Sequence, residues 1–427
     1  MKKASFGITV LVAVAMASYA AEDNRNKFGV YKDSLRRGAG FFSIHAITAP
    51  DLAKPTPSIA TMAPPLNKIA ATGASGVCFD LYGFSPDGAA LSQEGVQALR
   101  LVVGQTTWRR LGPVCRVFGP DAPEDEAGRM AAARAAGKAL SKDNQVVYLI
   151  DGAHSGALAK AFLEEAPGLV VAAPEGGNVA LVTEEPKERP DVPVILMGKM
   201  PEKPTEQDNY ILPADEASYA LLDRVMAKPV ESQPWTPDNS ILSEQERQEG
   251  FIALFDGKTL DGWWIAGMPN GFVARDGNIE WERAGGGAIL TRDRYENFIL
   301  RLEWRLEKSG SNSGIFLRAP RAGRSSKIGM EFQLMGDHGV PPEEHVTGAI
   351  YDVLSPISNA GRPVGEWNEL EITLDGPKMK AVLNGEVVQD LSLDDNEELK
   401  YRLRNGFIGL QDHGHKAAFR NIRLKRL

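Results

Sequence analysis

Cysteine, clustered basic charge and long apolar segments are all scarce in this chain of 427 residues. The cysteines are Cys78 and Cys115, so a disulfide-rich framework and a Cys/His zinc site are excluded. Both lie in apolar runs typical of core strands. We therefore expect two buried free thiols, with a disulfide between them as the alternative.

Other absences exclude several classes of partner and chemistry. The formal net charge is -8 and no stripe of Lys and Arg is present, which argues against a nucleic-acid partner. Past the N-terminus there is no run of about twenty apolar residues, so we predict no membrane anchor. The chain also lacks a Gly-x-Gly-x-x-Gly motif after a strand, a P-loop lysine and a Gly-x-Ser-x-Gly elbow.

The N-terminus has the pattern of a secretory signal peptide. Residues 1–3 are basic, residues 6–17 are apolar, and Ser18-Tyr19-Ala20 forms a small-residue cleavage site. The apolar core is too short to span a bilayer. We expect residues 1–20 to be removed by cleavage near Ala20, and the mature protein to be secreted or periplasmic.

Two regions with different patterns follow. Residues 25–228 contain short apolar strands that alternate with helices, such as Gly76–Tyr82 followed by Ser92–Val103. This predicts an α/β domain with a parallel sheet, either open or closed into a barrel. Residues 229–247 form a Pro-rich linker, in which Ser243 and Glu246 match a capping box.

Residues 248–427 predict an all-β domain. Asp-Gly and Asn-Gly dipeptides separate short strands whose number and spacing indicate a β-sandwich of the jelly-roll kind. From Arg301 to Arg318, and again from Gly329 to Gln333, charged or amide residues alternate with apolar ones. Because alternate side chains of a strand point to opposite faces, we expect one face lined with acids, arginines and amides that could bind a polyhydroxylated ligand.

Several segments of this domain resemble one family. They occur in the family's order, from the opening Phe251–Trp263 to the closing Phe419–Ile422. The segments between them are Glu303–Arg305, Asn312–Arg318, Met330–Gln333, Thr347–Tyr351, Gly365–Asn368, Leu383–Gly385 and Gly409–Gly414. Residues 250–427 thus resemble the 3-keto-disaccharide hydrolase domain, long catalogued as a domain of unknown function.

The resemblance implies a concanavalin A-like jelly roll that acts on glycosides oxidised at C3 of the sugar. A C3 ketone acidifies the C2 hydrogen, so a base can remove it and the C1 substituent can then leave by elimination, before water adds back. This route needs a carboxylate or imidazole base, a cation or donor near the C3 oxygen and an acid near the glycosidic oxygen. The expected substrate is therefore an oxidised carbohydrate, and the expected activity is that of a hydrolase or lyase.

Candidate site residues follow from strand parity and from the resemblance. Glu331 is the expected base, and His413 is the expected acid, with Asp412 next to it to fix its tautomer. Each of these could instead be structural, Glu331 as a strand carboxylate neutralised by an arginine. The expected substrate-binding residues are Glu303, Arg305, Asn312, Arg318, Gln333, Tyr351 and Gln411.

Four questions stay open in the sequence. No cofactor is expected, although His338 and His345 near Asp337 leave a divalent metal as an alternative. The sandwich could be a carbohydrate-binding module without chemistry, since its fold alone decides nothing. Catalysis could also lie in the α/β domain, at the carboxyl ends of its strands. The oligomeric state is not determined by the sequence.

Overall fold

The computed structural model describes residues 26–427, apart from 32–33, 39, 185–191, 202–203, 205–207, 228–234, 267–270 and 284–286. The predicted signal peptide and residues 229–234 of the predicted linker therefore lie outside the described residues. The chain divides into two compact units, one of residues 1–69 and 74–222 and the other of residues 70–73 and 223–427. No helix within the described residues is long and apolar enough to cross a bilayer.

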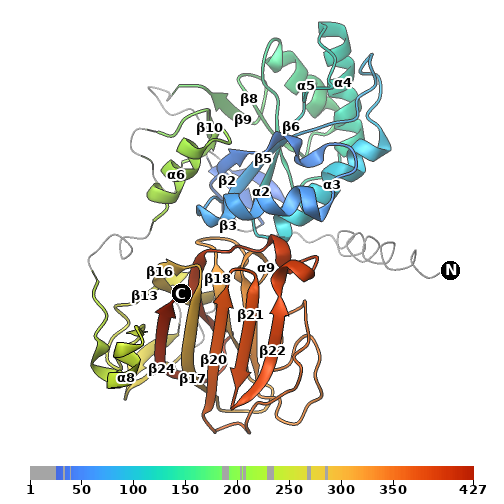
Figure 1. The fold of residues 1–427 in the computed structure, drawn as a ribbon. Helices are drawn as coiled ribbons and strands as arrows, with labels where there is room; N and C mark the ends of the chain where they lie inside the picture. Colours follow the sequence, from blue (N-terminus) through green and yellow to red (C-terminus); the bar gives the residue numbers. More distant parts are fainter. Residues whose placement is uncertain are drawn as a thin grey trace, which may run out of the picture. The chain divides into compact units, whose positions relative to one another are not determined.

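The first unit is a closed parallel β-barrel (Figure 1). Its strands, in their order around the barrel, are β10 (Val194–Met197), β11 (Tyr210–Leu212), β4 (His45–Thr48), β5 (Gly76–Asp80), β6 (Gly112–Arg116), β7 (Val147–Leu149), β8 (Val170–Ala173) and β9 (Val179–Val182). The sequence left an open sheet and a barrel as alternatives, because both contain fully buried strands. Closure through the pairing of β9 with β10 and of β11 with β4 decides for the barrel.

Helices and a small sheet accompany the barrel. The helices are α2 (Ile59–Ala71), α3 (Gln93–Trp108), α4 (Glu126–Leu140), α5 (Ser155–Glu165) and α6 (Glu216–Val225), and the sheet contains β1 (Phe28–Tyr31), β2 (Ser34–Arg37) and β3 (Gly40–Phe41). Ser92 and Asp125 cap α3 and α4 by accepting hydrogen bonds from backbone N–H groups. Cys78 and Cys115 are buried free thiols on adjacent strands, as expected.

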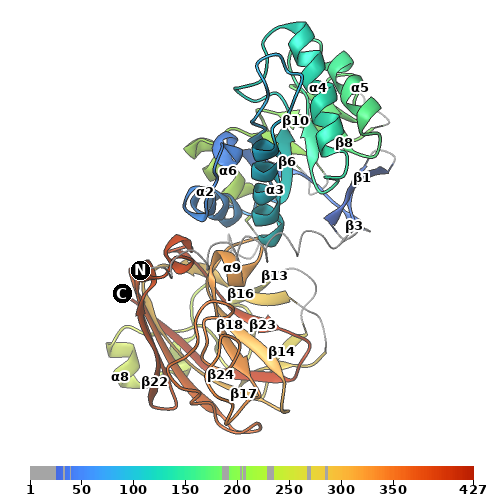
Figure 2. The same cartoon turned by 90° about the vertical axis from the view of Figure 1, so that its right-hand side faces the viewer.

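The second unit is an antiparallel β-sandwich. Its larger sheet contains β14 (Phe272–Arg275), β15 (Asn278–Trp281), β24 (Ala417–Arg426), β17 (Phe298–Leu306), β20 (Asn368–Asp375), β21 (Lys378–Leu383) and β22 (Glu386–Ser392), with β12 (Ile252–Ala253) beside β24 (Figure 1). The smaller sheet contains β13 (Trp263–Ala266), β16 (Gly287–Tyr295), β23 (Gly406–Asp412), β18 (Asn312–Ala319) and β19 (Met330–Met335), several of which are labelled in Figure 2. The predicted fold class, an α/β parallel-sheet unit followed by a β-sandwich, is confirmed.

Strand alternation builds the core between the two sheets. Along β17, residues Leu300, Leu302 and Trp304 are buried in that core, and the residues between them are partly exposed. Short helices lie at the edges: α8 (Glu244–Gln248), where the predicted capping box of Ser243 and Glu246 is confirmed, and α9 (Ser325–Ile328). Helix α9 lies in the connection between β18 and β19 and is close to both strands.

Candidate active site

Strand β17 belongs to the larger sheet and β19 to the smaller one, so their polar side chains do not lie on a common face. Leu302 and Trp304 pack into the core, so Glu303 and Arg305 point outward from the larger sheet. Glu331 belongs to the smaller sheet and points to that sheet's outer face, with the sandwich core in between. The predicted grouping of Glu303 and Arg305 with Glu331 is therefore wrong. Alternation gives the parity of side chains along a strand, but it does not give the sheet that the strand joins.

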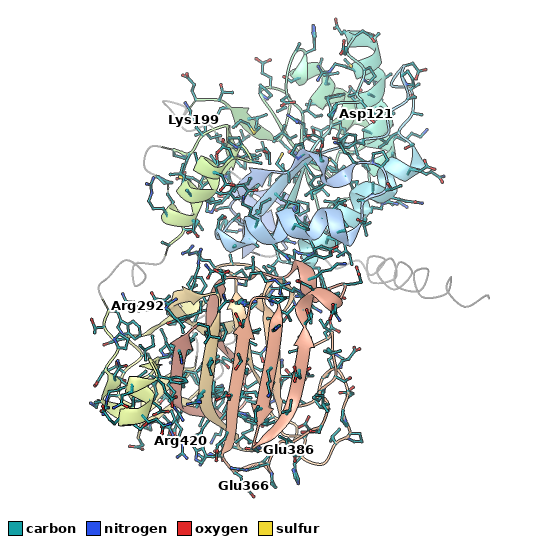
Figure 3. All side chains as sticks on the ribbon, viewed as in Figure 1. Asp121, Lys199, Arg292, Glu366, Glu386 and Arg420 are labelled. Atoms are coloured by element: carbon teal, nitrogen blue, oxygen red, sulfur yellow. The ribbon has the colours of Figure 1, made fainter. Side chains whose placement is uncertain are left out.

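The Glu303 and Arg305 side chains both form polar contacts with neighbouring side chains. The Glu303 carboxylate accepts hydrogen bonds from Arg420 Nε at 2.8 Å and from the Asn421 side chain at 2.5 Å. Arg305 forms an ion pair with Glu307, with 3.1 Å between Nε and Oε1. Figure 3 labels Arg420 on this sheet. These contacts explain both side chains as surface structure of the larger sheet.

Arg318 is a structural residue, which corrects the prediction that it binds substrate. Its side chain is fully buried and donates hydrogen bonds to the carbonyls of Glu296, at 2.5 and 2.8 Å, and Gly376, at 3.2 Å. Burial lowers the pKa of this arginine to about 10. The pairing of β18 with β23 shifts register between Phe316 and Ala319, and Arg318 has a φ of 51°. This irregularity breaks the alternation from which the sequence placed Arg318 beside Phe316.

Three polar side chains do come together on the outer face of the smaller sheet. Glu331 and Gln333 alternate with core residues along β19, and the register pairs Gln333 with Gly314 of β18. Gln411 of β23 lies in the same row across Gly314, because the preceding pair joins Leu410 to Ile315. The Gln411 side chain interacts with the Glu331 carboxylate and lowers its pKa. These three residues were predicted for the site from strand parity and resemblance.

Glycine at position 314 makes room for the carboxylate. A Cβ at this position would lie 2.4 Å from Glu331 Oε1 and 3.0 Å from the Glu331 carboxyl carbon. The Glu331 side chain therefore leans along the strand into the row of Gly314 and Gln333. Any larger residue at 314 would displace it.

The amide groups next to the carboxylate have unused acceptors. Gln333 is 1% exposed, and its Nε2 donates to Asn312 Oδ1 at 3.4 Å. Within the described residues, neither Gln333 Oε1 nor Gln411 Oε1 has a hydrogen-bond partner. A buried acceptor without a partner costs free energy, which a ligand that donates hydrogen bonds would recover. Sugar hydroxyl groups are donors of this kind.

Burial dominates the electrostatics of Glu331. The residue is 3% exposed, and loss of solvation raises the pKa of its carboxyl group to about 8. An apolar patch occupies much of the same face, and its members are Trp264, Ala288, Leu290, Phe316, Ala319 and Phe407. The positive charges of Arg324 and Lys327 lower the pKa of Glu331, but less strongly than burial raises it. A carboxyl group with such a pKa can exchange a proton near neutral pH.

Arg324 and Lys327 are residues of this site that the sequence analysis missed. Arg324 precedes α9 and Lys327 lies within it, and both interact electrostatically with Glu331. Lys327 is 1% exposed and forms an ion pair with Asp352. The signal that could have found them is their position, since both lie in the short connection that leads directly into the strand of Glu331.

Tyr351 and Asn312 lie next to Glu331 and Gln333, respectively. The Tyr351 backbone N–H donates to the carbonyl of Glu331 at 3.0 Å, and its ring contacts that of His345 edge to face, with 5.2 Å between centroids. Asn312 lies on the same face as Gln333 through the hydrogen bond described above. Both residues are therefore placed where contact with a ligand of Glu331 is feasible.

His413 and Asp412 have separate roles. Within the described residues, His413 shares no hydrogen bond with Glu331; it is exposed and stacks on His415 with 5.7 Å between ring centroids. It follows Gln411 by two residues and lies just past the end of β23. Asp412 points the other way and accepts hydrogen bonds from Gly271 N at 2.9 Å and Trp281 Nε1 at 3.1 Å. The prediction of a catalytic Asp412 is corrected, because this buried carboxylate holds the loop and strand around it.

With this geometry established, comparison with known proteins places the second unit. Residues 250–425 match the family model described as the 3-keto-alpha-glucoside-1,2-lyase-like domain. The predicted resemblance is confirmed. Glu331, Gln333 and Gln411 all lie inside the residues that match the lyase-like domain, whereas the barrel lies outside them.

Similar proteins cover the same part of the chain. A 3-keto-disaccharide hydrolase from Bacteroides thetaiotaomicron is 29% identical over 230 residues, which cover 42% of this chain and 79% of that protein. Two solved structures from Parabacteroides distasonis, whose names suggest glycosyl hydrolases, are 28% and 27% identical. They cover 44% and 42% of this chain and 98% and 99% of their own, with TM-scores of 0.39 and 0.37. The family match and the curated relative support a glycoside hydrolase-like enzyme.

The histidines considered for a metal have other contacts in the lyase-like domain. His338 Nδ1 is 2.7 Å from the carbonyl of Gly361, and the Asp337 carboxylate accepts from Thr347 N at 2.8 Å and Thr347 Oγ1 at 2.7 Å. His345 lies 3.6 Å from Asp352. Across the part of the chain that the structure describes, no three His, Cys, Asp or Glu side chains gather as metal ligands.

The barrel also carries charged groups at the carboxyl ends of its strands. Arg116 donates to both oxygens of the Asp80 carboxylate, at 2.8 and 2.9 Å, which links the ends of β5 and β6. Tyr82 donates to Asp51 at 3.2 Å. Fixed pairs of this kind account for these residues structurally, and the comparisons assign nothing to them.

Proposed function

We propose that the lyase-like domain cleaves 3-keto-glycosides, including 3-keto-disaccharides, by elimination followed by hydration. The observation that carries this proposal is the Glu331 carboxyl group, which is buried, has a pKa of about 8 and lies among amide oxygens without partners. A module that only binds sugar has no need of a buried carboxyl group tuned in this way. The family match and the name of the curated relative support the choice of substrate class.

In the proposed first step, the Glu331 carboxylate takes the proton from C2 of the sugar. The electrons of the C2–H bond form an enolate with the C3 ketone, whose oxygen then carries negative charge. Arg324 and Lys327 are the cations beside Glu331, so they would stabilise this enolate. They replace Arg305 and Arg318, which the sequence analysis expected to bind substrate, as the cations of the site.

In the second step, the C1–O bond breaks and its electron pair leaves with the glycosidic oxygen. The product is an enone with a double bond between C1 and C2. We assign the proton donor for the leaving oxygen to His413, which lies just past the end of β23, two residues after Gln411, and is exposed. Water then adds at C1 and gives a proton to His413, while a proton returns to C2 from Glu331, so that the net reaction is hydrolysis and both residues are regenerated.

The test compares a 3-keto-glucoside with the same glucoside unoxidised, using the full chain and Glu331→Gln. We expect cleavage of the keto substrate alone and at least a hundredfold loss of kcat/KM in the variant, because a base is removed. Deuterium at C2 of the sugar product formed in deuterated water would support the elimination route, because an ordinary glycosidase does not introduce it. Equal cleavage of both substrates would show that the elimination route is wrong.

Location and cofactor use are part of the same proposal. We infer export of the protein through the N-terminal signal sequence, with cleavage near Ala20. The elimination route uses protein side chains for each proton transfer, so we propose activity without a cofactor. Sequencing of the N-terminus of the mature protein tests the first inference, and activity after dialysis against a chelator tests the second.

A further inference from the structure

A pocket of about 410 Å³ lies beyond the end of β19. Its lining comes from Met335 on the strand itself and from three turns around it, and these residues are Ser309, Gly310, Gly336, Asp337, His338, Val340, Pro363 and Val364. None of them has a role in the proton transfers proposed above. The pocket therefore calls for an explanation of its own.

The pocket continues the face that carries the candidate active site. Met335 has the same strand parity as Glu331 and Gln333, and the register pairs it with Asn312, whose side chain accepts from Gln333. Because the Glu331 carboxylate leans against Gly314, it lies in the row of Gln333. Met335 is two residues further along the strand, which corresponds to about 7 Å.

This offset suits the leaving group of the proposed substrate. If C2 of the sugar lies over the Glu331 carboxylate, the group attached through O1 begins three bonds away, at roughly 3–4 Å, and extends further from there. A sugar that lies over Gln333 and Gln411 can therefore direct its C1 substituent toward Met335. The exposed His413, which we assigned as the proton donor to O1, lies just past the end of β23, two residues after Gln411.

The lining of the pocket selects the chemistry of that substituent. Met335, Val340, Pro363 and Val364 provide apolar surface, and Val340 and Val364 are 43% and 39% exposed. Both oxygens of Asp337 already accept hydrogen bonds from Thr347, and the other polar side chains of the lining are Ser309 and His338. Exposed apolar side chains in a concave site gain free energy by covering an apolar ligand.

We propose that this pocket is the leaving-group subsite and that it accepts an aryl aglycone in preference to a second sugar. The inference rests on the proposed function, which it extends from the reacting sugar to the group released. The preferred substrates of the full chain are then 3-keto-glucosides of phenols.

The experiment measures kcat/KM of the full chain on 4-nitrophenyl 3-keto-glucoside, on a 3-keto-disaccharide and on methyl 3-keto-glucoside. It is repeated with Val364→Asp, which places a carboxylate in the pocket. Ile357→Asp is the matched control, because Ile357 is an exposed apolar residue, at 64%, outside the pocket lining. We expect Val364→Asp to lower kcat/KM about tenfold or more on the aryl substrate and less than about twofold on the methyl substrate. Ile357→Asp should change neither.

The outcomes separate this proposal from the one on which it rests. If the wild-type protein cleaves the keto substrates but Val364→Asp changes the aryl and methyl substrates equally, or changes neither, the subsite assignment is overturned. A wild-type preference for the disaccharide over the aryl glucoside would overturn it as well. If none of the three keto substrates is cleaved, the proposed function itself fails and the subsite with it.

Discussion

Replacing Glu331 by glutamine should stabilise the sandwich, and the gain should depend on pH. Glutamine has nearly the same shape as the protonated acid but cannot ionise, so it removes the cost of a buried charge. Burial raises the pKa of Glu331 from 4.5 to about 8. In the unfolded chain the same group is solvated and ionises near its ordinary value.

The magnitude follows from the difference between these two pKa values. Between about pH 4.5 and pH 8 the folded state keeps a proton that the unfolded state has lost, so the stability of the wild-type protein falls as the pH rises. The loss is about 1.4 kcal/mol per pH unit, or roughly 5 kcal/mol over the whole interval. Below about pH 4.5 and above about pH 8 both states hold the same number of protons at this group, and its contribution is constant.

Denaturant unfolding followed by tryptophan fluorescence measures this difference. Apart from Trp108, the tryptophans lie in the second unit, so the signal reports mainly on the sandwich. We expect Glu331→Gln and the wild type to be similarly stable near pH 4.5, and the variant to be more stable by several kcal/mol near pH 8. Glu366→Gln is the control, because Glu366 is exposed (Figure 3) and its replacement should leave the pH dependence unchanged.

One result would refute this reasoning. If the difference in unfolding free energy between wild type and Glu331→Gln stayed the same from about pH 5 to pH 8, the folded protein would not hold the proton on Glu331. The assignment of a tuned base to this position would then lose its physical support.

Four further predictions follow from the site. The kcat/KM on a 3-keto-glucoside should rise with pH on the acidic side, because the ionised Glu331 is the base, and fall again at higher pH, because the mechanism also needs a protonated acid; a profile that is flat up to about pH 8 contradicts the role of Glu331. Gly314→Ala should lower kcat/KM at least tenfold and the free energy of unfolding by about 1–3 kcal/mol, because the alanine Cβ would collide with the Glu331 carboxylate. Unchanged kinetics would contradict the geometry. Arg318→Met should lower the free energy of unfolding by roughly 2–5 kcal/mol, because the buried carbonyls of Glu296 and Gly376 would lose their hydrogen-bond donor, and it should leave KM unchanged. A raised KM would mean that Arg318 binds substrate. Glu303→Gln should leave kcat/KM within about twofold, and a large loss would mean that the larger sheet contributes to the site.

The local features of the fold were predictable because they depend on short-range chemistry. The strand Phe298–Leu306 follows from the alternation of its residues, and the caps at Ser92, Asp125 and Ser243 follow from side chains that satisfy free backbone N–H groups. The two-part organisation follows from the change between helix and strand periodicities. Each of these patterns is complete within a few residues of sequence.

The candidate site was predictable only in part. Glu331 and Gln333 lie two residues apart on one strand, so their shared face could be read directly. Arg318 was misplaced because an irregular register interrupts the alternation of β18. Arg324 and Lys327 were missed because they lie in the connection between two strands, where no periodic pattern shows the direction of a side chain.

The sequence by itself therefore determined the two kinds of fold and the family resemblance, and it singled out the carboxylate that we propose as the base. Only the tertiary structure decided which strands share a sheet, and with it that Glu303 and Arg305 lie across the core from Glu331. It also decided that Glu331 is buried, which raises its pKa to about 8. The physical reason is that strand pairing and desolvation are set by contacts between residues far apart in the chain, and these contacts leave no local trace in the sequence.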